Sequence, residues 1–86
     1  MDSANPNSEK TIFHAGEFRL QIARLPIRLG QLLKNSNLVQ DGFEAKSRIT
    51  HGEVQVNDEV ETRRGRQLHL GDIVTVDGQD YRICSA

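Results

Sequence analysis

The hydrophobic period of the chain is helical between about Ile27 and Gly52 and changes at Gly52, and this change limits the folds that the chain can adopt. Before Gly52, Leu29, Leu32 and Leu33 have i, i+3, i+4 spacing, which is typical of a short helix that packs one face on a core. After Gly52, apolar and polar residues alternate in short runs separated by turn residues, as in half-buried strands. This pattern predicts an α+β fold with two short helices packed on a small, mainly antiparallel sheet.

Turn and capping residues give approximate bounds for the two helices. The leucine stripe predicts a first helix from about Ile27 to Ser36. Asp41 suits the N-cap of a second helix, and Glu44 three residues later completes a capping box. Gly52 suits the left-handed position that follows a helix. The expected core is shared by both helices and the strands: Leu29, Leu32, Leu33, Ala45, Ile49, Val54, Val56 and Val74.

The remaining segments predict strands and a polar tail. Alternation from Glu17 to Ala23 indicates an N-terminal strand. Asp77-Gly78 is a strong hairpin signal, whereas Asn57-Asp58 predicts a turn looser than type I′, because Asp is less permissive than Gly. Residues 1–11 have almost no apolar side chains, so we expect a disordered tail. One domain is expected over residues 12–86.

Composition excludes several classes of site. Cys84 is the single cysteine of 86 residues, so the chain offers no disulfide framework and no thiolate zinc site. His14, His51 and His69 have no metal-ligand spacing. We find no phosphate loop, no nucleophile beside a base and no apolar run of membrane-spanning length. We therefore expect a non-enzymatic, cytoplasmic monomer without cofactor, metal or small-molecule substrate.

Charge is arranged in blocks although the net charge is only −1. Four acids and no base lie between Glu53 and Glu61, and Arg63-Arg64-Gly65-Arg66 follows without an acid. Such blocks predict one face for a charged partner and another that avoids it. Arginine has a planar fork of donors that matches phosphate oxygens. The arginine block therefore suits a phosphate-rich partner, although such a block taken alone is more often a solvated turn.

The stretch from Arg28 to Asp77 resembles the small RNA-binding domain named after bacterial small-subunit ribosomal protein four (the S-four domain, or alpha-L motif), and within it the stand-alone bacterial YbcJ-like group. The resemblance rests on short pieces in a fixed order: Arg28-Leu29 with Leu32-Leu33, Glu44-Ala45-Lys46 with Ile49, Gly52, Val54-Gln55-Val56-Asn57, and Gly71-Asp72-Ile73-Val74. It implies two helices on a small sheet and binding to structured ribosomal or transfer RNA. Many members begin the second helix with Ser-Arg, where this chain has Asp41-Gly42.

Seven cations are the candidate RNA-binding residues: Arg28, Lys34, Lys46, Arg48, Arg63, Arg64 and Arg66. We expect Lys46 and Arg48 to lie beside the arginine block and share one patch with it, which would supply counterion release on binding. Nothing in the local sequence gives Arg63, Arg64 or Arg66 a structural role, so their charge is expected to be free for phosphate.

Two other functions fit the same residues. A protein-interaction module would dock through an acidic sheet face made of Glu53, Glu59, Glu61, Asp77 and Asp80. Alternatively, the chain would supply an RNA-binding subunit to a larger enzyme. Phe43 is expected to pack against Leu38 or Val39, and stacking on a base is the second possibility for its ring.

Overall fold

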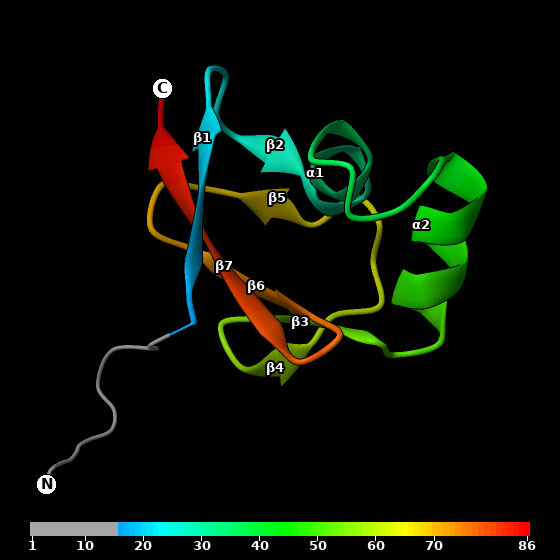
Figure 1. The fold of residues 1–86 in the computed structure, drawn as a ribbon. Helices are drawn as coiled ribbons and strands as arrows, with labels where there is room; N and C mark the ends of the chain where they lie inside the picture. Colours follow the sequence, from blue (N-terminus) through cyan, green and yellow to red (C-terminus); the bar gives the residue numbers. More distant parts are fainter. Residues whose placement is uncertain (1–15) are drawn as a thin grey trace, which may run out of the picture.

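A computed structural model describes residues 16–86, so the tail expected over residues 1–11 lies outside the described range (Figure 1). Within residues 16–86 the elements follow in the order β1 (Phe18–Ile22), β2 (Ile27–Arg28), α1 (Leu29–Asn35), α2 (Gly42–Thr50), β3 (Val54–Val56), β4 (Glu59–Val60), β5 (Gln67–Leu68), β6 (Ile73–Val76) and β7 (Gln79–Ser85). Figure 1 shows both helices together on one side of the molecule, with β1 and β7 far from α2. The expected two helices on a mainly antiparallel sheet are confirmed.

The described strands form one five-stranded sheet in the order β1-β7-β6-β3-β4 and a two-stranded ladder of β2 with β5. Neighbours in the large sheet are antiparallel except β1 and β7, which run parallel with Leu20 opposite Ile83. The sheet is therefore mixed, and it joins the N-terminal strand to the last strand of the chain. The β2–β5 ladder places Arg28 opposite Gln67, at the start of α1.

Two tight turns set the register of the hairpins. Asp77 and Gly78 have φ values of 54° and 75°, as expected for a type I′ turn. Asn57 and Asp58 also have positive φ, 52° and 71°, so the expectation of a looser turn there is wrong. The Asn57 side chain explains this: its Oδ1 accepts from the Ile73 N–H at 2.9 Å and its amide donates to Asp72 at 3.1 Å.

The first helix is shorter than the leucine stripe suggested. Arg28 has extended backbone angles and pairs with β5, so α1 begins at Leu29 rather than Ile27. It still buries Leu29, Leu32 and Leu33 completely. The helix ends at Asn35, where the following Ser36 N–H bonds the Leu32 carbonyl.

One contiguous core joins the helices to the sheet, and every residue expected in it is buried. Its members come from α1, α2, the strands and the connection between the helices: Leu29, Leu32, Leu33, Val39, Ala45, Ile49, Val54, Val56, Leu68, Val74, Val76 and Ile83. The expectation that Phe43 packs against Leu38 or Val39 is wrong, because its side chain is 80% exposed. Neither helix of the described residues has the length and apolarity to cross a membrane.

Replacing the N-cap Asp41 with Ala should lower the free energy of unfolding by about 1 kcal/mol. The Asp41 carboxylate accepts the Glu44 N–H at 2.9 Å, and the Glu44 carboxylate accepts the Gln40 N–H at 2.7 Å, so the cap fixes the first turn of α2. Urea unfolding measures the loss. Asp41→Asn is the matched control and should retain most of the stability, and equal stability of parent and Asp41→Ala would contradict the capping role.

Candidate nucleic-acid interface

The start of α1 is capped by the arginine block, which lies much later in the chain. The N-cap residue Arg28 makes no side-chain cap. Instead, the Leu29 N–H donates to the Arg66 carbonyl at 2.9 Å and the Gly30 N–H donates to the Arg64 carbonyl at 3.0 Å. These are two of the N–H groups that a helix start leaves without a partner in the helix. The loop is therefore fixed against α1 by its backbone, independently of its side chains.

Gly30 allows this loop to lie flat on the helix. A Cβ atom added at Gly30 would already be in van der Waals contact with Arg64, 3.6 Å from its Cβ and 3.7 Å from its carbonyl oxygen. Any larger side chain would push the loop outward. Glycine inside a helix costs roughly 0.5–1 kcal/mol relative to alanine. A Cβ atom here would make only ordinary contacts, so the loop restricts this position to a small side chain without requiring glycine.

A hollow of about 380 Å³ lies where α1, the start of α2 and this loop meet. Its cations are Arg28, Lys34 and Arg64, and its other lining residues are Gly30, Gln31, Gly42, Ala45 and Gly65. The lining contains no acid, and none of the three cations forms an ion pair with a residue in the described range 16–86. Three exposed, uncompensated cations around a concave surface are suited to hold phosphate groups. We call this site the basic hollow.

Glu61 anchors the other side of the same loop. Its carboxylate is buried and accepts from Arg63 Nε and from Arg66 Nη1, both at 2.8 Å, and from the Arg63 N–H at 3.1 Å. These bonds, first those from Arg63 and then those from Arg66, lower the pKa of Glu61 to about 2. The expectation that the charges of Arg63 and Arg66 are not needed by neighbouring acids is therefore wrong. Of the three arginines in the block, Arg64 is the one that lines the basic hollow.

The depressed pKa of Glu61 makes stability depend on pH in a defined window. Its pKa falls from 4.5 to about 2 on folding, so its contribution is present above pH 4.5 and is lost as the pH falls from about 4.5 towards 2. Unfolding of the parent and Glu61→Gln by urea, at a series of pH values, should show the largest stability difference near neutral pH. That difference should shrink steadily below about pH 4.5. A difference that is constant with pH would contradict the role of the charge.

Arg48 lies among three acids. Its guanidinium bonds Glu53 at 2.8 Å and also bonds Asp77, with Glu44 at 3.8 Å, and its side chain is only 17% exposed. The bond to Asp77 is the main cause that raises the Arg48 pKa. The charge of Arg48 is thus already compensated within the fold. Lys46, two residues earlier, is exposed on α2.

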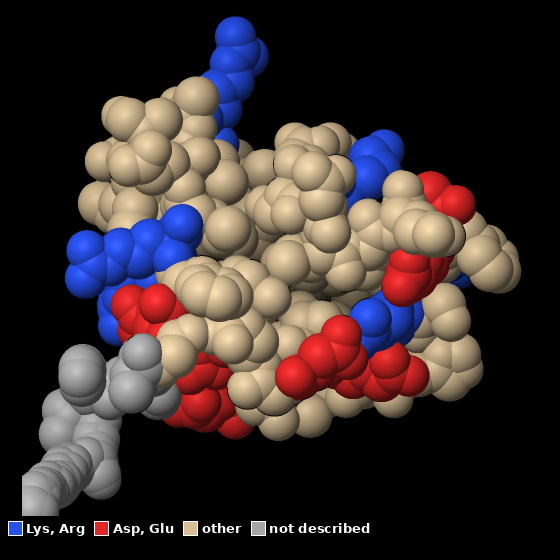
Figure 2. Space-filling view, in the orientation of Figure 1, with Lys and Arg blue, Asp and Glu red and all other residues tan. Residues whose placement is uncertain are grey.

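The acids expected to form one docking face have mostly found intramolecular partners. Glu61 is buried, Glu53 and Asp77 bond Arg48, and Asp80 accepts the Thr75 hydroxyl at 2.6 Å. In Figure 2 acidic atoms lie in several patches, at the left and lower left as well as at the lower right and right, and cationic atoms lie beside or between them. The view thus shows neither a bare acidic face nor a uniformly basic one.

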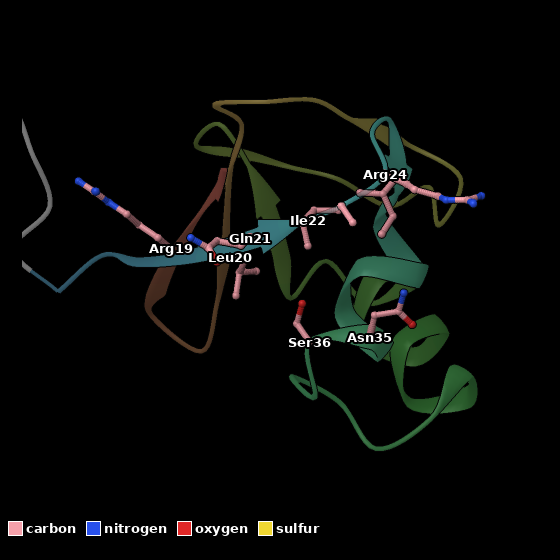
Figure 3. Close-up of a pocket in the computed structure, with 9 residues that line it drawn as sticks. Arg19, Leu20, Gln21, Ile22, Arg24, Asn35 and Ser36 are labelled. Carbon is pink, nitrogen blue, oxygen red and sulfur yellow. The ribbon is translucent and has the colours of Figure 1, made fainter. Parts of the chain in front are cut away.

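A second, larger hollow of about 580 Å³ lies between β1, the turn after it and the end of α1 (Figure 3). Leu20, Ile22 and Ile27 give it an apolar side, and Asn35 and Ser36 line it from α1. Figure 3 shows the charged ends of Arg19 and Arg24 pointing away from its interior. It therefore differs from the basic hollow, whose lining includes Arg28, Lys34 and Arg64.

The sequence predicts the cations of the basic hollow but not the uncharged residues that line it beside them. Gly30, Gln31, Gly42 and Gly65 line it, and they carry no charge that would single them out. A glycine within the leucine stripe was the available signal, because glycine inside a helix usually needs a packing reason. Asp41 and Gly42 stand where many members of the resembling family have Ser-Arg. Asp41 caps α2, and a Cβ atom added at Gly42 would meet no atom within 4 Å.

Known proteins are similar to this chain in sequence and in fold. A family model described as the S4 domain matches residues 20–84. The probable ribosome maturation protein RlbA of Bacillus subtilis (strain 168) is 48% identical over 52 residues, which are 60% of this chain and 73% of that protein. The small ribosomal subunit protein uS4m of Schizosaccharomyces pombe is 36% identical over 62 residues, which are 72% of this chain but only 19% of that protein.

Among solved structures, the solution structure of YbcJ from Escherichia coli has a TM-score of 0.57 and 26% sequence identity, and the match covers 88% of this chain and 95% of that one. That structure is described as revealing an alpha-L motif involved in RNA-binding. The family model covers most of the chain, and RlbA is matched over more than two thirds of its own length. The chain therefore belongs to the S4 domain family, a family of RNA-binding domains.

Proposed function

We propose that this protein binds structured RNA of the ribosome through the basic hollow, with Arg28, Lys34 and Arg64 as phosphate ligands and Lys46 as a further contact. The observation that carries the proposal is that three exposed cations without acidic partners among residues 16–86 line one hollow. Lys46 follows Ala45, which lines the hollow from α2. The proposed action is binding without catalysis, in the cytoplasm.

The shape of the site fits the way in which RNA is recognised. Double-stranded RNA is bound mostly through its shape and backbone, because side chains do not reach the bases in its deep major groove. A small concave site with cations on fixed elements meets this need without base-reading residues. Arg64 is fixed by the backbone bonds of its loop to α1, and Lys34 belongs to α1 itself. Such preorganisation lowers the entropy lost on binding.

Ribosomal RNA is the favoured class because two relatives carry ribosomal names. RlbA is named as a probable ribosome maturation protein, and uS4m as a small ribosomal subunit protein. Transfer RNA is the second class that the family resemblance implies, and it is the natural competitor in a binding assay. The acidic docking face is less favoured, because most of its acids are occupied by partners within the fold.

Salt dependence is the direct test of this function. With four phosphate contacts, log affinity should fall against log salt with a slope of roughly −3.6, since each contact contributes about −0.9. Fluorescence anisotropy of a labelled, structured fragment of bacterial ribosomal RNA, titrated at several salt concentrations with transfer RNA as competitor, measures the slope and the preference. A flat slope, or no binding at low salt, would contradict the proposal.

A further inference from the structure

Phe43 is an aromatic side chain that the core leaves in solvent. It is 80% exposed on the first turn of α2, and no ring contact is found for it within residues 16–86, whereas Phe18 lies 5.7 Å from Tyr81 between ring centroids. A single exposed apolar residue is ordinary on a protein surface. Phe43 differs from such a residue because it lies near the basic hollow.

Helix geometry places Phe43 on the outer side of α2, next to the cationic surface. Successive residues turn by about 100°, so Phe43 lies about 160° around the helix from the inward-facing Ala45. Gly42 and Lys46 lie between these two directions, at about 100° and 60° from Phe43. A path around the helix from the hollow therefore passes Gly42, then Lys46, and reaches Phe43.

This path is sterically open, and the two acids beside it are held in the capping box of α2, where Glu44 also has Arg48 as a cationic neighbour. A Cβ added at Gly42 would meet nothing within 4 Å, so a nucleic-acid backbone can approach the helix closely there. The two acids of this turn are engaged: Asp41 accepts the Glu44 N–H, and Glu44 accepts the Gln40 N–H and lies 3.8 Å from Arg48. Exposed aromatic rings beside cations that hold a phosphate backbone are the combination used to bind single-stranded nucleic acid.

We propose that Phe43 is a stacking platform for an unpaired base of the RNA whose phosphates occupy the basic hollow. This inference rests on the proposed function and makes it more specific. The preferred ligand becomes a helix that ends in a loop or bulge, with the paired part on Arg28, Lys34 and Arg64 and the first unpaired base on Phe43. A fully paired RNA would use the cations alone.

The experiment compares two RNAs: a hairpin whose loop is a run of about six adenosines, and a blunt duplex with the same stem. Phe43→Ala should weaken hairpin binding about 5- to 160-fold, the range for loss of one stacked base, and leave duplex binding within about twofold. Phe43→Trp should retain hairpin affinity, whereas Phe43→Leu, which keeps an apolar side chain without a ring, should lose nearly as much as Phe43→Ala. Leu70→Ala is the matched control: Leu70 is also exposed, at 63%, and its removal should change neither affinity.

The outcomes separate this inference from the proposed function. If Lys34→Gln weakens both RNAs while Phe43→Ala weakens neither, or both equally, stacking is wrong and the basic hollow remains the binding site. Hairpin affinity of Phe43→Leu equal to that of the parent would also overturn stacking. If the parent protein binds neither RNA, the proposed function fails and the stacking platform fails with it. Because Phe43 is exposed, circular dichroism should show all of its variants folded as the parent is.

Discussion

The double variant Lys34→Gln/Arg64→Gln should bind structured ribosomal RNA about 60-fold more weakly than the parent in 0.1 M salt, and its salt slope should shrink from roughly −3.6 to roughly −1.8. Both side chains are exposed and line the basic hollow without acidic partners in the described residues. Each lost phosphate contact removes the release of about 0.9 counterion, so two lost contacts change the slope by roughly 1.8. In 0.1 M salt this change of slope corresponds to about 60-fold in affinity. Anisotropy titrations over a range of salt concentrations measure the affinity and the slope together.

The matched control removes the same charge from another part of the surface. The variant Arg19→Gln/Arg24→Gln also removes two positive charges. Both arginines are exposed, but they line the larger hollow beside β1 and not the basic hollow. It should lower affinity only through the weak long-range field, with little change in slope. Equal losses in the two double variants would show that RNA responds to net charge alone and would contradict a localised site.

Replacement of Glu61 with Ala should lower the free energy of unfolding by about 2 kcal/mol, which for a domain of this size is a fall of roughly 8–16 °C in Tm. The buried carboxylate is held by Arg63 and Arg66, and its loss leaves both guanidinium groups without that partner. RNA affinity should fall as well, measured at a temperature where the variant is folded. The direction is diagnostic, because removal of an acid near phosphates would raise affinity if charge alone mattered.

Glu59→Ala is the control for this variant. Glu59 is an exposed acid on β4, two residues before Glu61, and its loss changes the net charge by the same amount. Its stability should stay within about 0.5 kcal/mol of the parent, and its affinity should stay equal or rise slightly. A Glu61→Ala protein that binds RNA more tightly than the parent would show that the anchoring of the arginine loop is irrelevant to binding.

The fold was largely predictable because its signals are local. The leucine stripe, the Asp41 and Glu44 cap and the Asp77-Gly78 turn each act over a few residues, and the structure has all three. The errors occurred where a distant segment decides. Pairing with β5 draws Ile27 and Arg28 out of the first helix, and contacts of Asn57 with Asp72 and Ile73 tighten a turn that its own sequence describes as loose.

The candidate site was less predictable for the same reason. Arg63, Arg64 and Arg66 are alike in sequence, yet two of them bond Glu61 and the third lines the basic hollow. Arg63 and Arg66 differ from Arg64 because they bond Glu61, which is buried. The sequence gives no sign of this burial, because Glu61 belongs to a run of acids that are otherwise expected to be exposed. Helical spacing did contain the signal for Phe43, because its direction on α2 is nearly opposite to that of Ala45.

The hydrogen bonds that cap α1 also affect the order in which parts of the chain can fold during synthesis. During synthesis α1 emerges well before Arg64 and Arg66, whose carbonyls accept its first N–H groups. A helix of seven residues is not stable alone in water, so it waits for that loop. The central sheet is later still, because β1 needs β7 as its partner. A nascent or truncated chain that has not reached β7 would therefore lack the complete fold that holds the basic hollow, and any affinity for RNA that depends on this hollow would arise in the same cooperative step as the fold.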